Sequence, residues 1–225
     1  FHVDVNFPDY GGFGPGGPQS NADIFAPEWV HTLHEAVAEA DAFINLHLLT
    51  DDPRRCVDTY AGSGAGAICF QLDAVPDAPA LHDLLGAIRR MGAVASPVIE
   101  TQGSAARPAI SPDAVYTRLK PHLAQIHLLT LQAAHTAARS DDPRTAFAAD
   151  AVRGYLQPLL ADPAFDGAVQ VQGGITTATV AEAVRCGARF LVAGTQLFRN
   201  REGASPAQVI AQMRQSACAI NGCDE

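Results

Sequence analysis

The sequence predicts an α/β protein, a (β/α)8 TIM barrel that forms a single domain over residues 1–225. Short apolar or β-branched runs recur along the chain, and an alanine- and leucine-rich stretch with helical spacing follows each of them. This alternation is typical of parallel βαβ units. An open doubly wound sheet is the alternative arrangement of such units. A chain of 225 residues also has the size of one barrel domain.

The periodicity defines the elements in order, and prolines and glycines mark their limits. Pro27 and Pro206 stand where a first helical turn tolerates a missing N–H, and Gly66 and Gly187 stand where a helix gives way to the next strand. The expected strands are Phe1–Asn6, Phe43–Leu49, Ala67–Ala74, Ala93–Ile99, Gln125–Leu131, Ala168–Gln172 and Phe190–Ala193. The expected helices are Pro27–Glu39, Asp52–Ser63, Ala78–Met91, Ser111–Leu119, Asp142–Leu160, Thr177–Cys186 and Ser205–Ile220. An eighth strand, before Phe1, is expected to complete the barrel.

Charge and hydropathy exclude two classes of partner. The net charge is −9, and the 15 lysines and arginines are scattered along the chain. This distribution gives no electrostatic footprint for nucleic acid or for an anionic membrane surface. No apolar run approaches the roughly 20 residues that cross a bilayer, and no signal-peptide pattern opens the sequence. A cytoplasmic protein is therefore expected.

The five cysteines are widely spaced and lie mostly in apolar segments. An odd number without ligand spacing indicates reduced core thiols rather than a disulfide or zinc framework. A second compositional feature is the segment Asp9–Ser20, which contains five glycines and two prolines. In a barrel it is a loop on the catalytic face, and it is either a lid or a solvated connection.

Two histidines and an aspartate are candidates for a metal site. His2 and Asp4 lie two residues apart on one expected strand, so their side chains share a face, and His47 stands near the end of the next strand. Catalytic groups of barrels lie at the carboxyl ends of strands. Two imidazoles and a carboxylate there suit a divalent metal with an open position. The alternative is three polar residues satisfied by local hydrogen bonds.

Glycines at the ends of two consecutive strands are candidates for phosphate binding. The segment Val169–Thr176 reads VQVQGGIT, and Leu191–Thr195 reads LVAGT. Glycines let backbone N–H groups approach an anion, and barrel phosphate sites form after the last two strands. The candidate donors are Gly173, Gly174, Gly194 and Thr195. The alternative is that these residues only make tight turns between strands and helices.

Five motifs in order resemble the ribulose-phosphate 3-epimerase family and its hexulose-phosphate relatives. They are HVDV (His2–Val5), LHLLTDDP (Leu46–Pro53), GAGAICF (Gly64–Phe70), VQGGI (Val171–Ile175) and VAGTQLF (Val192–Phe198). The resemblance covers nearly the whole chain and begins at the family's second strand. It implies a (β/α)8 barrel in which a divalent metal, held by two His and two Asp, stabilises an enediolate. It also implies that the two Asp act as acid and base on opposite faces of the substrate carbon.

Carried onto this sequence, the resemblance assigns three metal ligands, His2, Asp4 and His47, and makes Asp4 one of the acid/base pair. Zn, Mn, Fe and Co are the candidate ions. The fourth position is Gln172, whose carboxamide cannot exchange a proton near neutral pH and adds no negative charge to the metal site. Inversion by two carboxylates at positions 4 and 172 is therefore excluded, and the metal site is weakened.

Other positions depart from the family pattern or offer substitutes. Gln71 stands where a histidine is common, and the glycine-rich phosphate loop is replaced after Gln132. Glu100 and Asp73 lie near strand ends and His135 lies in the altered loop, and each is either a second proton-transfer group or a solvated loop residue. The remaining histidines, His31, His34, His82 and His122, are expected at the surface, with His127 inside the barrel.

Three functions are consistent with these residues. The first is a ketose-phosphate epimerase or isomerase in which Asp4 abstracts a proton beside a carbonyl, with Gln172 altering the acid/base pair. The second is a lyase, a dehydratase or retro-aldolase, acting on a sugar or nucleoside in secondary metabolism. The third is a non-catalytic sugar-binding barrel. A small-molecule sugar or sugar phosphate is the expected partner, and a homo-oligomer is the expected assembly.

Overall fold

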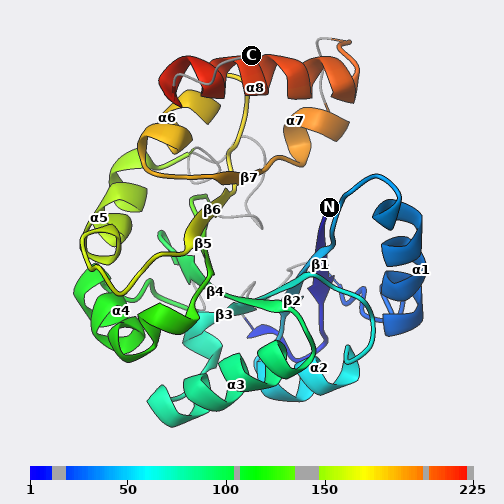
Figure 1. The fold of residues 1–225 in the computed structure, drawn as a ribbon, viewed down its shortest axis with the longest axis vertical. Coiled ribbons are helices and arrows are strands. Elements are labelled where there is room, and N and C mark those ends of the chain that lie inside the picture. Colours follow the sequence, from blue (N-terminus) through cyan, green and yellow to red (C-terminus); the bar gives the residue numbers. More distant parts are fainter. Residues whose placement is uncertain (12–18, 104–106, 135–146, 200–202, 222–225) are drawn as a thin grey trace.

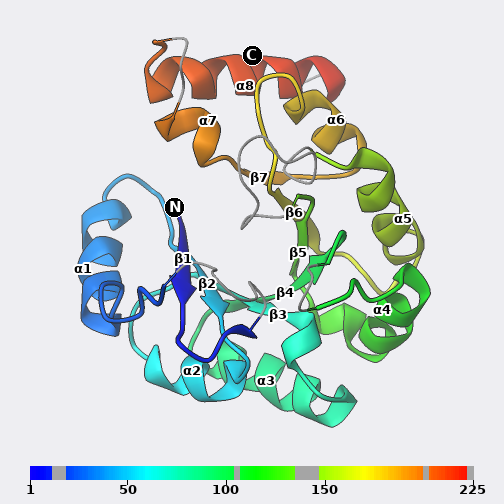
Figure 2. The same ribbon diagram turned by 180° about the vertical axis from the view of Figure 1, so that it is seen from behind.

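The computed structural model describes residues 1–11, 19–103, 107–134, 147–199 and 203–221. Its centre is one sheet of seven parallel strands in chain order, surrounded by helices (Figures 1 and 2). The strands are β1 (His2–Asn6), β2 (Asn45–Leu49), β3 (Ala67–Gln71), β4 (Val94–Glu100), β5 (Leu128–Gln132), β6 (Ala168–Gln172) and β7 (Phe190–Val192). The α-helices are α1 (Pro27–Ala38), α2 (Pro53–Thr59), α3 (Ala78–Arg90), α4 (Pro112–Leu119), α5 (Ala149–Leu160), α6 (Val180–Arg185), α7 (Thr195–Phe198) and α8 (Pro206–Asn221).

The sheet is curled into the greater part of a barrel. Asn45 of β2 donates a hydrogen bond from Nδ2 to Oε1 of Gln170 on β6 over 2.6 Å, although three strands lie between them in the sheet. Close to this contact, the rings of Phe43, just before β2, and Phe190, at the start of β7, lie 6.4 Å apart. Such contacts require strong curvature. The predicted α/β barrel fold is confirmed, and within the described residues its edges are β1 and β7, which do not pair with each other. The eighth strand remains a prediction.

The interior of the curled sheet contains a layer of hydrogen-bonded polar side chains from β2 to β6. They are Asn45, Cys69, Ser96, Thr130 and Gln170, and all five are buried. The hydroxyls of Ser96 and Thr130 are 2.7 Å apart, and Gln170 Nε2 donates to Thr130 over 3.1 Å. Burial raises the pKa of the Cys69 thiol to about 11, so this thiol stays protonated at neutral pH. Because side chains alternate along a strand, this layer also fixes which later residues point inward.

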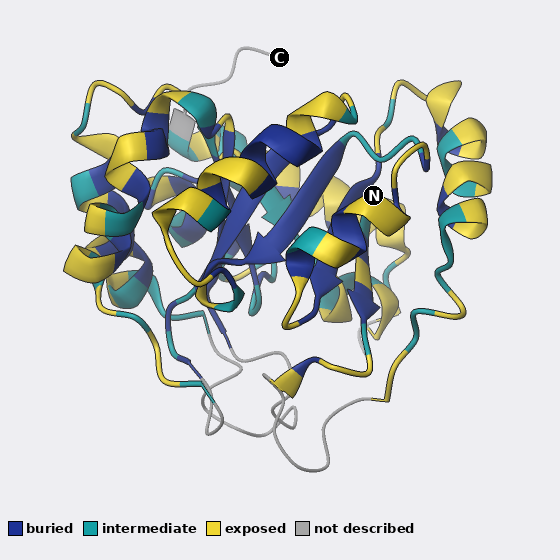
Figure 3. Ribbon diagram, turned by 90° about the horizontal axis from the view of Figure 1, so that it is seen from below, coloured by how far each residue is buried: buried dark blue, intermediate teal, exposed yellow. Residues whose placement is uncertain are grey.

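The outer face of the sheet packs against the helices, as the dark blue strands and inner helical faces of Figure 3 show. Three of these helices begin at a side-chain N-cap, which is an aspartate in two of them and a serine in the third. Asp52, Asp77 and Ser111 accept hydrogen bonds from the backbone N–H groups at the starts of α2, α3 and α4, and a proline follows in the first turn. The sequence predicts these starts to within one residue because capping chemistry is local.

Several segments differ from the expected elements, and one short helix, α7, was not expected. Two 3-10 helices, η2 (Leu72–Ala74) and η3 (Lys120–Gln125), replace the end of one expected strand and the beginning of another. In η3 the proline at the first turn favours a short turn over an extended strand. Helix α5 begins at Ala149 rather than Asp142, since Phe147 and Ala148 are not helical and 142–146 lie outside the described residues. No described helix is long and apolar enough to cross a membrane.

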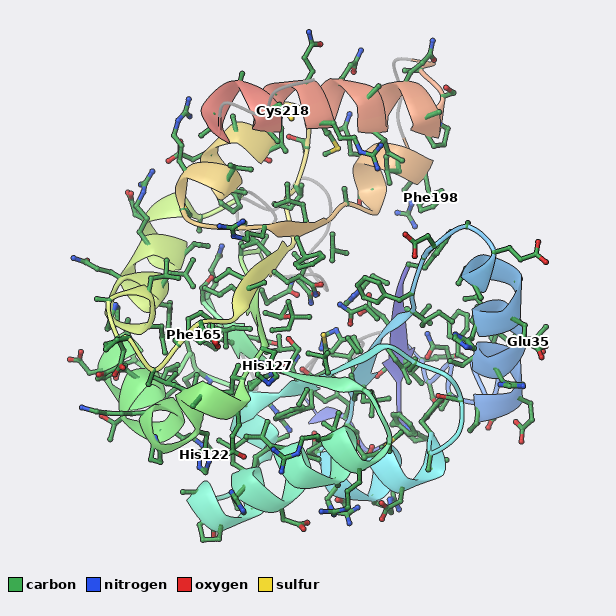
Figure 4. The ribbon with its side chains drawn as sticks, viewed as in Figure 1. Glu35, His122, His127, Phe165, Phe198 and Cys218 are labelled. Atoms are coloured by element: carbon green, nitrogen blue, oxygen red, sulfur yellow. The ribbon has the colours of Figure 1, made fainter. Side chains whose placement is uncertain are left out.

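The burial of two histidines, both labelled in Figure 4, is the opposite of that expected. His122, predicted at the surface, is only 6% exposed and lies on the outside of the sheet where η3 packs against α3. His127, predicted inside the barrel, is exposed. The inward positions of β5 are Thr130 and Gln132, and η3 displaces the start of the strand beyond His127. Neither ring nitrogen of His122 has a hydrogen-bond partner among the described residues.

The burial of His122 predicts acid sensitivity. Burial and then the charge of His82 lower the pKa of His122 below its usual 6.5, so the folded state binds this proton less readily than the unfolded chain. Above about pH 6.5 His122 is neutral in both states and does not reduce the free energy of unfolding. Below this pH the unfolded chain binds the proton more tightly, so the free energy of unfolding falls. We expect the His122→Leu variant to lose less free energy of unfolding than wild type between pH 7 and pH 5, measured by urea denaturation. His31→Leu, at an exposed position, is the control, and equal losses in wild type and His122→Leu would contradict this origin.

Candidate active site

The inward faces of β1 and β2 bring His2, Asp4 and His47 together at the mouth of the curled sheet. Asp4 pairs with His47 in the strand register, and its Oδ1 lies 2.8 Å from His47 Nδ1 and 3.2 Å from His2 Nε2. One ligand atom from each residue lies within 4.8 Å of the other two. His47 is 2% exposed, whereas the side chain of Asp4 is 55% exposed within the concavity. The carboxylate is thus held by two imidazoles and remains accessible to a small molecule.

The electrostatics of this cluster keep Asp4 ionised. Partial removal of water from Asp4 raises the pKa of its carboxyl, but hydrogen bonds with His2 and His47 and the electrostatic attraction of these residues outweigh this effect and hold the pKa well below its usual range. Burial lowers the pKa of His47, and this effect exceeds the opposing influence of Asp4. At neutral pH the cluster therefore contains a carboxylate and a neutral buried imidazole, the protonation states that a metal site requires.

The cluster has the donor chemistry of a divalent metal site. Two imidazole nitrogens and one carboxylate oxygen within 4.8 Å of one another fit an ion such as Zn²⁺, with room for further ligands on the exposed side of Asp4. The other ring nitrogens, His2 Nδ1 and His47 Nε2, are buried and find no hydrogen-bond partner in the described part of the chain. Metal-bound histidines usually have such a partner, so the ring orientations here depend on packing and on Asp4.

Gln172, at the end of β6, faces this cluster through its amide nitrogen. It is 4% exposed, and its Nε2 lies 3.5 Å from His47 Nδ1. The neighbouring Gln132 fixes this orientation, because its own Nε2 donates to the Ala134 carbonyl and its Oε1 accepts a hydrogen bond from Gln172 Nε2. Gln172 Oε1 is buried with no partner among the described residues. The chain thus presents an N–H donor to the cluster at the position where the resemblance implies a second carboxylate.

The four candidate phosphate donors follow β6 and β7. Gly173 and Gly174 both have positive φ, and a Cβ at Gly173 would lie 2.7 Å from Gln132 Nε2 and 2.8 Å from the Ala134 carbonyl oxygen. Glycine is therefore required at 173 by the backbone and by packing. Gly194 has a φ of −99°, and a Cβ there would meet nothing within 4 Å of the described residues. Gly194 and Thr195 lie at the start of α7, and both are exposed.

A second polar cluster lies at the ends of β3 and β4 around Glu100. Glu100 Oε1 accepts hydrogen bonds from Gln71 Nε2 over 3.1 Å and from the Tyr10 hydroxyl over 3.3 Å. Burial and then the charge of Asp73 raise the pKa of Glu100. Asp73 forms an ion pair of 3.1 Å with Arg107. Of the three possible substitute acids, Glu100 is held inside the mouth, Asp73 is ion-paired, and His135 lies outside the described residues.

Tyr10 and Arg107 are site residues that the sequence analysis does not identify. Arg107 pairs with both Asp51 and Asp73, and its guanidinium lies 5.2 Å from the centre of the Tyr10 ring. Burial and the nearby acidic charges raise the pKa of Tyr10, so its hydroxyl remains a donor at neutral pH. Tyr10 could have been suspected from the sequence, because it is an aromatic residue in a glycine-rich loop that follows a strand. Arg107 gives no comparable signal, since its partners come from other loops.

Comparisons with known proteins identify a family and related enzymes. A model of the ribulose-phosphate 3-epimerase family matches residues 24–198, which include His47 and Gln172 but not His2 or Asp4. The ribulose-phosphate 3-epimerase of Eremothecium gossypii is 26% identical over 206 residues, which cover 84% of this chain and 73% of that protein. The same enzyme of Candida glabrata is 25% identical over 179 residues, and the match covers 80% of this chain and 63% of that protein.

Solved structures support the fold. The tryptophan synthase alpha chain of Legionella pneumophila superimposes with a TM-score of 0.59 at 15% identity, covering 99% of this chain and 81% of that one. The 3-hexulose-6-phosphate synthase of Salmonella typhimurium gives 0.55 at 14% identity, with coverage of 85% and 81%. At these identities the likeness concerns architecture alone. Because the family model spans most of the chain, this protein belongs to the ribulose-phosphate 3-epimerase family.

Proposed function

We propose that this protein is a ketose-phosphate epimerase or isomerase in which the Asp4 carboxylate removes a proton from the carbon beside a ketose carbonyl. The observation that carries the proposal is the Asp4 carboxylate, kept ionised by His2 and His47 and 55% exposed in the mouth of the barrel. Membership of the epimerase family supplies the reaction class. A base must reach the proton it removes, and Asp4 is the exposed carboxylate within that cluster.

His2, Asp4 and His47 would hold a divalent metal ion. When bound, such an ion supplies positive charge that stabilises negative charge on a substrate oxygen beside it. The protein's own contribution is to fix the two imidazoles and to keep Asp4 within reach of the substrate. Gln172 adds an N–H donor and no negative charge to this arrangement, so the affinity for the ion is expected to be lower than with a carboxylate there.

Gly173, Gly174, Gly194 and Thr195 are the proposed contacts of the substrate phosphate. Backbone N–H groups at a strand-to-helix turn are suited to bind an anion. Gly194 supports this role best, because neither its φ nor its packing against described residues requires a glycine. As the N-cap of α7, Gly194 leaves the backbone open to close approach by a ligand.

A lyase is the second candidate, and Gln172 is the observation that favours it. With a carboxamide at this position, the cluster retains one acid/base carboxylate, which is enough for a reaction in which a leaving group departs instead of a proton returning to carbon. The two candidates differ in their products, since a retro-aldolase or a dehydratase cleaves the substrate and an epimerase conserves its atoms.

The test is solvent exchange. Ribulose 5-phosphate is incubated with the metal-loaded protein in D2O, and deuterium at carbon is followed by NMR together with the products. We expect deuterium to enter the carbon beside the carbonyl with the carbon skeleton intact. Cleavage products would favour the lyase. Absence of exchange with both ribulose 5-phosphate and fructose 6-phosphate would overturn the proposal and favour a binding protein.

A further inference from the structure

We propose that Glu100 is the second proton-transfer group of this site and delivers a proton to the substrate carbon on the face opposite Asp4. The inference rests on the proposed function, in which Asp4 removes the first proton. It adds the residue that completes an epimerisation in a chain where Gln172 cannot do so. Four structural observations support it: the inward position of Glu100, its distance from Gln172, its hydrogen bonds and its access to solvent.

Glu100 points into the barrel, in the same layer as Gln172. Ser96, four residues earlier on β4, contacts Thr130 in the interior, and residues four apart on a strand share a face. The strand register pairs Glu100 with Gln132 and Gln132 with Gln172. The side chains of Gln132 and Gln172 form a hydrogen bond, and Gln172 reaches His47. Glu100 therefore belongs to the layer that contacts the His2, Asp4 and His47 cluster.

In this proposal the second carboxylate of the site is Glu100 on β4, and not the residue at position 172 on β6. Glu100 and Gln172 are separated by two strand spacings, which amounts to about 10 Å of backbone separation. Three strand spacings separate Glu100 on β4 from Asp4 on β1, so the curled sheet places the two carboxylates on different sides of the mouth. Tyr10 joins these sides, because it lies just after β1 and its hydroxyl donates to Glu100 over 3.3 Å. One side chain thus spans from the end of β1 to that carboxylate.

Hydrogen bonds fix the orientation of the Glu100 carboxyl group, as proton transfer to a substrate requires. Two donors, Gln71 Nε2 and the Tyr10 hydroxyl, fix Oε1, and Gln71 Oε1 is buried with no partner in the described structure. The second amide atom of Gln71 is thus left to accept a hydrogen bond from a bound ligand. The raised pKa of Glu100 brings the carboxyl closer to the pH at which it both holds and releases a proton.

Glu100 also has a route by which its proton is replaced. A pocket between the end of β4 and the segment 107–110 is lined by Asp73, Glu100 and Arg107 and opens to the surface. A group that gives a proton to substrate in each turnover must exchange with water before the next one. Asp4 meets the same requirement through its exposed side chain.

The proposed step conserves atoms and electrons. The Asp4 carboxylate takes the proton from the carbon beside the carbonyl, and the electron pair of that C–H bond moves to the carbonyl oxygen to give an enediolate. The Glu100 carboxyl then gives its proton to the same carbon from the other face, as the carbonyl re-forms. The product is the epimer, with Asp4 protonated and Glu100 ionised, and exchange with water resets both groups.

The experiment compares Glu100→Gln with wild type in D2O, with ribulose 5-phosphate as substrate and both deuterium incorporation and epimer formation measured. Without the second group, Asp4 still removes the proton, exchanges with solvent and returns a deuteron to the same face. We expect deuterium incorporation to stay within about threefold of wild type while epimer formation falls at least about 100-fold. Glu35→Gln makes the same chemical change on the exposed face of α1 and should alter neither rate (Figure 4).

The outcomes separate the two proposals. Persisting incorporation also shows that the variant is folded, since a misfolded protein exchanges nothing. Epimer formation by Glu100→Gln near the wild-type rate would overturn the role of Glu100 and leave the proposed function intact. Loss of both signals in this variant alone would assign Glu100 a structural or binding role and also overturn the inference. Absence of exchange by wild type itself would overturn the proposed function, and the role of Glu100 with it.

Discussion

Replacing Asp4 by Asn is expected to reduce both turnover and deuterium exchange by roughly 10²- to 10⁴-fold, the range of a general base. The amide has nearly the same shape and can still accept a hydrogen bond from an imidazole, but it cannot take a proton. Initial rates with ribulose 5-phosphate and incorporation of solvent deuterium measure the effect. Both the epimerase and the lyase predict this loss, because both need a base in the cluster.

Asp83→Asn is the matched control for this substitution. Asp83 makes an exposed ion pair with Arg54 over 2.7 Å, remote from the mouth, and its loss should leave the rates unchanged. Near-full turnover by Asp4→Asn would show that the chemistry occurs elsewhere. The melting temperature of the variant distinguishes loss of catalysis from loss of the fold. It is expected to fall, because His2 and His47 stabilise the ionised carboxylate in the folded state, but a cooperative transition above the assay temperature shows that the variant is folded.

Gln172→Asp is expected to tighten binding of a divalent metal on the order of 10- to 100-fold. The substitution replaces an N–H donor that faces His47 with a negatively charged oxygen donor, and affinity for a hard cation rises with the number of charged ligands. Titration calorimetry with Zn²⁺ or Mn²⁺, supported by metal content after dialysis, measures the change. The variant gives up the hydrogen bond between Gln172 and Gln132, so a modest loss of stability is also expected.

Gln172→Asn is the control for that variant. Asparagine has the length of aspartate but no charge. An effect of the shorter side chain therefore appears in both variants, whereas an effect of the negative charge appears only in Gln172→Asp. Equal metal affinity in the two variants would contradict the assignment of His2, Asp4 and His47 as the metal site. If epimer formation appeared only in Gln172→Asp, the natural protein would lack a second acid, which would also argue against Glu100.

The family comparison and the site geometry answer different questions about this protein. The matched region contains the strands and glycines of the epimerase family, and this is enough to assign the family and the barrel. The identity of the proton-transfer groups depends instead on Gln172 and Glu100, where this chain departs from the pattern that the resemblance implies. A family assignment at 25–26% identity therefore leaves the acid/base pair to be derived from the residues themselves.

The sequence by itself determined the order of the elements and the face on which the ligand residues lie. Alternation with a period of two places His2 and Asp4 together on β1, and local capping chemistry defines the starts of α2 to α4. These features depend on residues a few positions apart. The carboxamide at Gln172 is a local feature of the same kind, because it directly precedes the two glycines of the VQGGI motif.

Only the tertiary structure decided which inward side chains meet across the barrel. The contact of Gln172 with His47, the hydrogen bond from Tyr10 to Glu100 and the ion pairs of Arg107 join residues that are distant in sequence. The burial of His122 is of the same kind, since it results from how η3 packs against α3. Periodicity specifies the face of each strand, but the curl of the sheet sets the distances between those faces.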